Sequence, residues 1–213
     1  MNDAQLTEAL RVYLVADPDH CDGDLIATVR AAIAGGVTSV QLRAKSLSDR
    51  EALGLAYQLR ELTLAKGVLF LINDRIDLAV AAVADGVHLG VDDLPLEVAR
   101  VFGGPAFVIG YSPETDVQAM AAAAAGANYL GVGPVFGTAT KSDAGAAIGL
   151  PKVSERATSA GIPVIGIGGV TAENAGSVIS AGAVGVAVVS AIAKAADPCA
   201  AASALAAAVR AAL

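Results

Sequence analysis

The chain of 213 residues has no tryptophan, two cysteines and two histidines. Cys21 and Cys199 lie far apart and form no CxxC pair, so we expect neither a disulfide framework nor a zinc site. Charged residues make up 16% of the chain and sum to a net charge of −7, which argues against a nucleic-acid partner. The 55% of hydrophobic residues excludes a disordered chain. We predict a single domain over residues 1–213, with a short N-terminal extension over about residues 1–10.

Long hydrophobic runs are also missing. The longest nearly uncharged run, residues 181–193, is shorter than the roughly 20 residues that a membrane-spanning helix needs. The first ten residues carry acidic side chains and lack the apolar segment of a signal peptide. We therefore expect no membrane partner and a cytoplasmic location, with which two thiols agree.

Eight short runs rich in Val, Ile and Leu recur along the chain, as expected for parallel strands buried on both faces. They are residues 12–15, 39–42, 68–72, 86–89, 107–109, 129–132, 163–167 and 184–189. Helical stretches lie between them, for example residues 24–34, 48–65, 77–84, 114–125 and 171–181. Ser48 with Glu51 forms a capping box, and Thr171 is a candidate N-cap.

Eight strands at a repeat of roughly 25 residues predict an α/β protein, a single-domain (β/α)8 TIM barrel. A doubly wound sheet is the alternative, but the first strand is followed by Ala16-Asp17-Pro18 without a glycine fingerprint. In a barrel the chemistry lies where strands end and the following loops begin. The polar residues that follow the apolar runs are therefore the candidate site.

Gln41, Arg43 and Lys45 alternate after the second run and would share one face of an extended chain. Arginine grips a phosphate with two parallel hydrogen bonds, and lysine adds a point charge. The alternative is a strand end with solvated charges. The trio predicts an anionic ligand at this mouth of the barrel.

Asp74 and Asp93 follow the third and fourth runs, about one barrel repeat apart. Carboxylates at adjacent strand ends can converge on one Mg²⁺, which takes one or two carboxylates and keeps places for water and phosphate oxygens. The alternative is that each aspartate caps the following helix. Asp92 competes for the metal role, but its side chain should point away from that of Asp93.

A glycine-rich loop with Thr138, Thr140 and Lys141 follows the sixth run, and Gly168, Gly169 and Ser190 follow the last two. Such loops, with a short helix over residues 190–193, are typical of a phosphate site. Tight turns without a ligand are the alternative. We interpret His88 as a core or loop-bracing histidine rather than a general base, and His20 as a surface residue.

Taken in order, these segments resemble the thiamine-phosphate synthase family, from about Val12 to the C-terminus. The resemblance rests on the motifs VQLRAK (40–45), INDRIDLA (72–79), ADGVHLG (84–90), YLGVGPVFGTATK (129–141), IGGVTAEN (167–174) and GVAVVSAI (185–192). It implies a Mg²⁺-dependent transferase that joins a pyrimidine diphosphate to a thiazole phosphate and releases pyrophosphate.

The resemblance also implies a role for each residue. The pyrimidine diphosphate would be held by Gln41, Arg43, Lys45, Asn73, Ser112 and Lys141, of which Arg43, Lys45 and Lys141 would act in catalysis. Asp74 and Asp93 would bind one Mg²⁺ per subunit. The thiazole phosphate would be held by Thr138, Thr140, Gly169, Val189 and Ser190.

The chain departs from the family pattern at several positions. Ala44 stands where the family usually has Glu, Val91 where it has Gln, Pro113-Glu114 where it often has Thr-His, and Gly137 and Ala139 where it usually has Pro. Three alternatives stay open: a thiazole tautomerase, a binding paralogue without catalysis, and another phosphate-binding barrel. An Ala-rich surface is compatible with a homodimer.

Overall fold

The computed structural model describes residues 1–138, 140 and 145–213. Its eight strands pair in parallel and in sequence order, and β8 returns to pair with β1, so the sheet closes. They are β1 (Val12–Ala16), β2 (Ser39–Leu42), β3 (Leu69–Asn73), β4 (Gly86–Leu89), β5 (Val108–Tyr111), β6 (Tyr129–Val132), β7 (Val164–Ile167) and β8 (Gly185–Val188). The predicted (β/α)8 barrel is confirmed, and the predicted strands lie within two residues of the observed ones.

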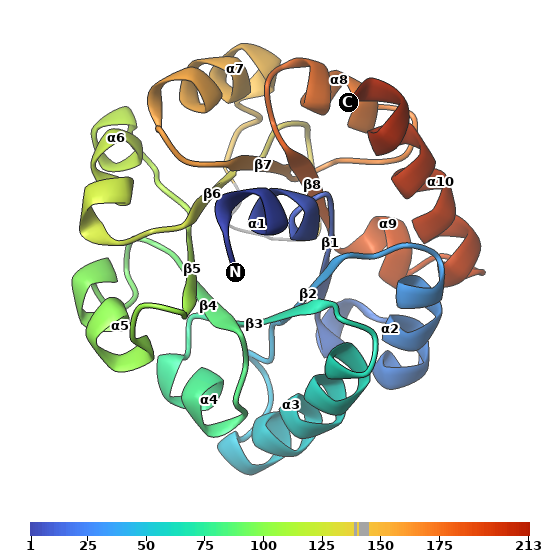
Figure 1. Ribbon diagram of the computed structural model, residues 1–213. Helices are drawn as coiled ribbons and strands as arrows, with labels where there is room; N and C mark the ends of the chain where they lie inside the picture. Colours follow the sequence, from blue (N-terminus) through green and yellow to red (C-terminus); the bar gives the residue numbers. More distant parts are fainter. Residues whose placement is uncertain (139, 141–144) are drawn as a thin grey trace.

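Helices surround the barrel (Figure 1). They are α2 (Leu25–Ala34), α3 (Asp49–Leu64), α4 (Ile76–Ala81), α5 (Leu96–Gly103), α6 (Asp116–Ala125), α7 (Gly149–Ser159), α8 (Ala175–Ser180), α9 (Ser190–Ala193) and α10 (Pro198–Ala212), with a short 3-10 helix η1 (Pro18–His20). The capping box of Ser48 and Glu51 opens α3 as predicted. The N-cap predicted at Thr171 is wrong, because α8 begins after Asn174, whose side chain turns back to accept the N–H of Thr171.

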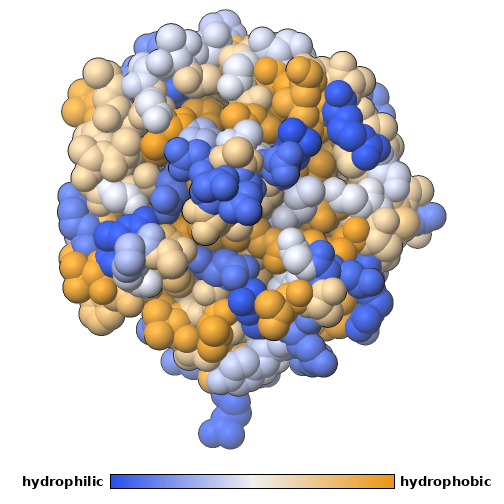
Figure 2. All heavy atoms as spheres, viewed as in Figure 1, coloured by the Kyte–Doolittle hydropathy of each residue, from blue (hydrophilic) through white to orange (hydrophobic). Residues whose placement is uncertain are grey.

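The first ten residues close one end of the barrel. Helix α1 (Asp3–Ala9) lies across this opening in front of the strands (Figure 1), and hydrophilic atoms gather at the centre of the same face (Figure 2). Leu6 and Leu10 pack into the barrel interior against Leu69, at the amino end of β3. The amino ends of the strands are therefore covered, and the carboxyl ends form the other mouth.

Candidate active site

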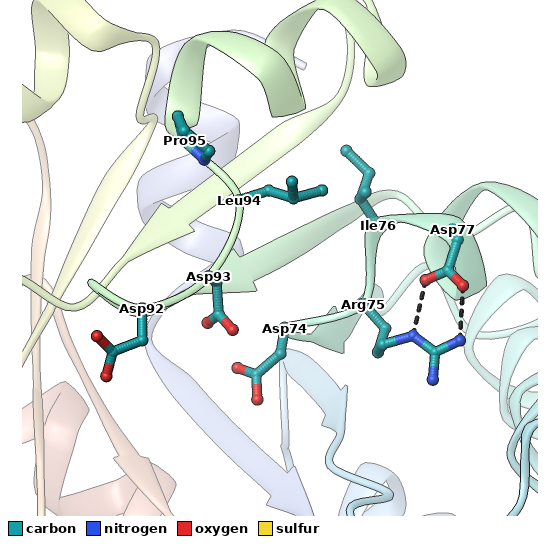
Figure 3. A pocket seen from close by; sticks show the side chains of 8 residues that line it. All are labelled: Asp74, Arg75, Ile76, Asp77, Asp92, Asp93, Leu94 and Pro95. Carbon is teal, nitrogen blue, oxygen red and sulfur yellow. Dashed lines mark hydrogen bonds and ion pairs between the residues drawn. The ribbon is translucent and has the colours of Figure 1, made fainter.

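The two carboxylates predicted to bind a metal meet at the carboxyl ends of β3 and β4. They line a cavity of about 400 Å³, in which the side chain of Asp93 points toward Asp74 while that of Asp92 points elsewhere (Figure 3). Asp74 adopts a φ of 62°, a left-handed conformation that aspartate tolerates better than most residues, and its N–H donates to the His88 carbonyl at 2.8 Å. This backbone turn brings the Asp74 carboxylate beside the β4 loop.

Neither aspartate caps the helix that follows it. The N-caps of α4 and α5 are Arg75 and Pro95, and neither makes a side-chain capping bond. Asp93 instead accepts the N–H of Gly90 on its Oδ2 at 2.7 Å. The capping alternative is therefore wrong for both residues.

The charges around this pair favour a cation. Burial raises the pKa of Asp93; the Gly90 hydrogen bond opposes this, and the nearby Asp74 carboxylate raises the pKa further. The Lys45 ammonium lies 3.1 Å from Asp74 Oδ2. In the described part of the chain no group of three or more His, Cys, Asp and Glu residues is placed to hold a metal. Two carboxylate donors with room for further oxygens fit Mg²⁺, which leaves places for water and phosphate.

The three predicted anion-binding residues diverge from one another. Gln41 is 3% exposed and lies inside the barrel, where its Nε2 donates to Asn73 Oδ1 at 2.7 Å. Arg43 pairs with Asp17 after β1, whereas Lys45 pairs with Asp74 after β3. Strand β2 ends at Leu42, so the strict alternation of an extended chain stops before Arg43. Arg43 and Lys45 follow the carboxyl end of β2, and Gln41 is the last but one residue of that strand.

Asp17 is a candidate site residue that the sequence pattern did not indicate. Its side chain is 2% exposed and accepts hydrogen bonds from Arg43 Nη1 and, at 2.9 Å, from the N–H of Asp19. The ring of His20 lies 3.0 Å from the same carboxylate, so His20 is part of this cluster and not a free surface residue. A buried carboxylate beside a guanidinium holds it in one orientation. Asp17 thereby fixes where Arg43 points.

The loop after β5 carries Ser112. Its hydroxyl lies 2.8 Å from His88 Nε2. The carbonyls of Pro113 and Glu114 accept hydrogen bonds from the buried Arg156 of α7, each at 3.0 Å. Pro113 and Glu114, which depart from the family pattern, therefore anchor the Ser112 loop through their backbone carbonyls.

Comparison with known proteins identifies the family of this chain. The family model for thiamine monophosphate synthase matches residues 12–192. The chain belongs to this family. It is 48% identical over 195 residues to the thiamine-phosphate synthase of Roseiflexus castenholzii, covering 91% of this chain and 86% of the relative. It is 51% identical over 198 residues to that of Haloarcula marismortui, covering 91% and 94%.

Solved structures agree with this family. The thiamine phosphate pyrophosphorylase from Pyrococcus furiosus superposes with a TM-score of 0.90 at 38% identity, over 98% of this chain and 99% of that one. A 3-hexulose-6-phosphate synthase, with a TM-score of 0.61 at 19% identity over 92% and 99% of the two chains, shares the fold alone. The predicted family membership is confirmed.

The loops after β6, β7 and β8 meet at the same mouth in this family member. The hydroxyls of Thr140 and Ser190 are 3.2 Å apart, and Thr138 Oγ1 accepts the N–H of Thr140 at 3.3 Å. A Cβ on Gly169 would stand 2.5 Å from the Gly137 carbonyl oxygen, so glycine there lets two loops approach each other. Val189 precedes α9, which forms over Ser190–Ala193 as predicted. Lys141 and Ala139 lie outside the described residues.

Proposed function

We propose that the carboxyl mouth of this barrel joins 4-amino-2-methyl-5-(diphosphooxymethyl)pyrimidine to 4-methyl-5-(2-phosphooxyethyl)thiazole, giving thiamine phosphate and pyrophosphate. With the 2-carboxylate of the thiazole as substrate, CO2 would be released as well. The chain is a transferase of thiamine biosynthesis, like the relatives that match most of its length. The observation that carries the proposal is the Asp74–Asp93 pair beside Lys45, with Arg43 on the neighbouring strand end.

The proposed chemistry needs no protein nucleophile. The bond between the pyrimidine methylene carbon and the diphosphate oxygen breaks, and its electron pair leaves with the diphosphate. The electron-rich aminopyrimidine stabilises the resulting cation, and the thiazole nitrogen then donates its lone pair to form the new C–N bond. Because the nitrogen already carries that lone pair, no general base is required.

The protein's part is to position both substrates and to stabilise the departing negative charge. Arg43 and Lys45 supply fixed positive charge, with Lys141 as a third predicted cation. Asp74 and Asp93 would hold one Mg²⁺, which when bound neutralises diphosphate oxygens. Gln41, Asn73 and Ser112 would hold the pyrimidine, and Thr138, Thr140, Gly169, Val189 and Ser190 the thiazole phosphate.

A pyrophosphate-release assay tests this proposal. Release should require both substrates and should stop after chelation of Mg²⁺. Asp74→Asn and Asp93→Asn should each lower turnover by about 100-fold, the scale of one lost charge-stabilising group. Asp92→Asn is the matched control, since its carboxylate points away from the pair (Figure 3), and should retain turnover. Full release in EDTA, or equal losses in all three variants, would remove the carboxylate pair from the mechanism.

The same assay separates the alternatives. A tautomerase would convert the thiazole without the pyrimidine diphosphate, and a binding paralogue would release no pyrophosphate even with both substrates present. The third alternative, another phosphate-binding barrel, gains no support from the 3-hexulose-6-phosphate synthase, whose similarity is confined to the fold.

We also expect a homodimer in the cytoplasm. Exposed apolar side chains support the dimer: Val101 and Phe102 on α5, and Val117 and Met120 on α6. Hydrophobic atoms gather over α5 at the left of Figure 2. Sedimentation velocity of Phe102→Lys against the unmodified chain tests this expectation.

Across the described helices, none has the length and hydropathy to cross a membrane.

A further inference from the structure

A continuous chain of hydrogen bonds crosses the barrel interior and joins two of the proposed pyrimidine-binding regions. It begins at Ser112 after β5 and ends at Asn73 on β3. The successive pairs are Ser112 Oγ–His88 Nε2 (2.8 Å), His88 Nδ1–Tyr129 OH (2.9 Å), Tyr129 OH–Tyr13 OH (2.8 Å), Tyr13 OH–Gln41 Oε1 (3.1 Å) and Gln41 Nε2–Asn73 Oδ1 (2.7 Å). The mechanism above makes no use of three of its members, His88, Tyr129 and Tyr13.

The barrel is built around this chain. Tyr13 and Tyr129 are 1% and 0% exposed, and their rings meet edge to face with centroids 6.2 Å apart. A Cβ on Gly110 would stand 2.2 Å from the Tyr129 ring, and one on Gly131 would stand 2.9 Å from the His88 ring. Glycine at these two strand positions therefore makes the space that the two rings fill.

The hydrogen-bond chain runs in one direction, because each hydroxyl has a single proton to donate. Gln41 donates its amide N–H to Asn73, so its oxygen accepts the proton of Tyr13. Since Tyr13 has no second proton, its oxygen accepts from Tyr129. The Tyr129 oxygen in turn accepts from His88, which must carry its proton on Nδ1.

The direction continues to the mouth of the barrel. The His88 ring lies inside the barrel between two hydroxyl partners, where burial disfavours the charged form, so the ring is neutral and has a single N–H. With that proton on Nδ1, the lone pair on Nε2 accepts the hydroxyl proton of Ser112. The Ser112 oxygen is left with its lone pairs free to accept a hydrogen bond.

We propose that Tyr13 and Tyr129 are positioning residues that hold His88 as its Nδ1–H tautomer and Ser112 as an acceptor for an N–H group of the pyrimidine substrate. The substrate part of this inference rests on the proposed function. An exocyclic amino group supplies such an N–H, whereas a carbonyl oxygen at the same place would meet the lone pairs of Ser112. The buried chain thus sets which hydrogen-bonding pattern the site accepts.

Nitrogen-15 NMR of the histidine rings tests the tautomer directly and independently of activity. The chain has two histidines, and His20→Asn assigns the remaining signals to His88. At pH 7 we expect His88 to show a protonated Nδ1 and an unprotonated Nε2. In Tyr13→Phe, Tyr129 loses its acceptor and becomes free to donate to His88, so the Nε2–H form should appear. Tyr129 separates Tyr13 from His88, so this effect must pass along the chain.

Two variants sharpen the test. Ser112→Ala removes the far end alone and should keep the Nδ1–H tautomer. Tyr57→Phe, on the exposed surface of α3, is the matched control and should leave the tautomer unchanged. An Nε2–H tautomer in the unmodified chain, no change in Tyr13→Phe, or a switch in Ser112→Ala would each overturn the proposal.

Kinetics give the second readout. Tyr13→Phe and Tyr129→Phe should raise KM for the pyrimidine diphosphate about tenfold, the scale of one misdirected hydrogen bond. KM for the thiazole phosphate should stay within about twofold, because the hydrogen-bond chain ends at residues that would hold the pyrimidine. A general loss of structure would instead raise both KM values. Equal increases in both KM values would contradict a positioning role. If the unmodified chain releases no pyrophosphate, the proposed function fails, but the tautomer remains measurable.

Discussion

Asp17→Asn should both destabilise the protein and misdirect Arg43. The carboxylate of Asp17 is 2% exposed and the side chain of Arg43 is 21% exposed, so most of this ion pair is shielded from water. Removing one partner of a fully buried pair costs about 3–5 kcal/mol. Arg43 can regain some water here, so we expect a loss of about 2–3 kcal/mol in the free energy of unfolding. For a chain of this length each kcal/mol lowers Tm by about 2–4 °C, which gives a shift of about 4–12 °C.

Asparagine is the informative replacement because it keeps the shape of the side chain. Its Oδ1 can still accept the N–H of Asp19, the bond that opens η1. Its amide nitrogen, however, would stand as a donor against the guanidinium of Arg43. Glu8→Gln is the control, since Glu8 and Arg11 form an exposed pair at 3.9 Å. Exposed pairs of this kind contribute about 0–1 kcal/mol.

Calorimetry of the single and double variants isolates the pair. In an Arg43→Ala background the same Asp17→Asn change should cost at least about 1 kcal/mol less, because contacting residues couple. Pyrophosphate release, measured well below Tm, should fall about tenfold in Asp17→Asn if Arg43 must be held in place. The reasoning is refuted if Asp17→Asn costs the same with and without Arg43, or if it retains full turnover while Arg43→Ala is inactive.

Two further predictions concern the barrel interior, and a third concerns helix α3. Burial lowers the pKa of His88 to about 4, although the nearby charge of Asp74 acts in the opposite direction. Between pH 4 and pH 6.5 the unfolded chain therefore binds a proton at this ring that the folded chain does not bind. The contribution of the neutral His88 ring to the free energy of unfolding is therefore fully present above pH 6.5. Urea unfolding should show this free energy falling by about 2 kcal/mol between pH 7 and pH 4.5, and the His88→Gln variant should show a smaller fall. Gly110→Ala should cost about 1–3 kcal/mol or more, because its Cβ would stand 2.2 Å from the Tyr129 ring. Gly54→Ala, in α3 with nothing within 4 Å, should instead stabilise by about 0.5–1 kcal/mol.

The strands were predictable because parallel barrel strands are buried on both faces. Residues 39–42, 86–89 and 129–132 are strands with the predicted bounds. The Asp74–Asp93 pair followed from the same rule, since carboxyl ends of neighbouring strands share one mouth of a barrel. The interpretation of His88 as a core or bracing residue agrees with its two hydrogen bonds inside the barrel.

Contacts between polar residues that lie far apart in the sequence could not be predicted. Tyr13 belongs to an apolar run, and nothing near it indicates that its hydroxyl meets Tyr129, 116 residues later. The meeting depends on how β1 and β6 face each other across a closed barrel. Asp17 is a similar case, because its role comes from Arg43 at the end of the next strand.

The burial of a strand and the direction of a hydrogen-bond chain differ in how much of each is encoded in one segment of the sequence. Hydrophobic periodicity records the burial of a segment, which is a property of that segment, and so it predicts strands and the mouth where they end. The direction of a hydrogen-bond chain depends on the number of protons each member can give and on which partner takes them. Gln41 shows both: its place at the end of the second apolar run predicted a site residue, but its two hydrogen bonds, to Tyr13 and to Asn73, set the direction of the whole hydrogen-bond chain. Reversing that one amide would turn Ser112 from an acceptor into a donor, so the hydrogen-bonding pattern offered to the substrate is a property of six residues on five strands and one loop.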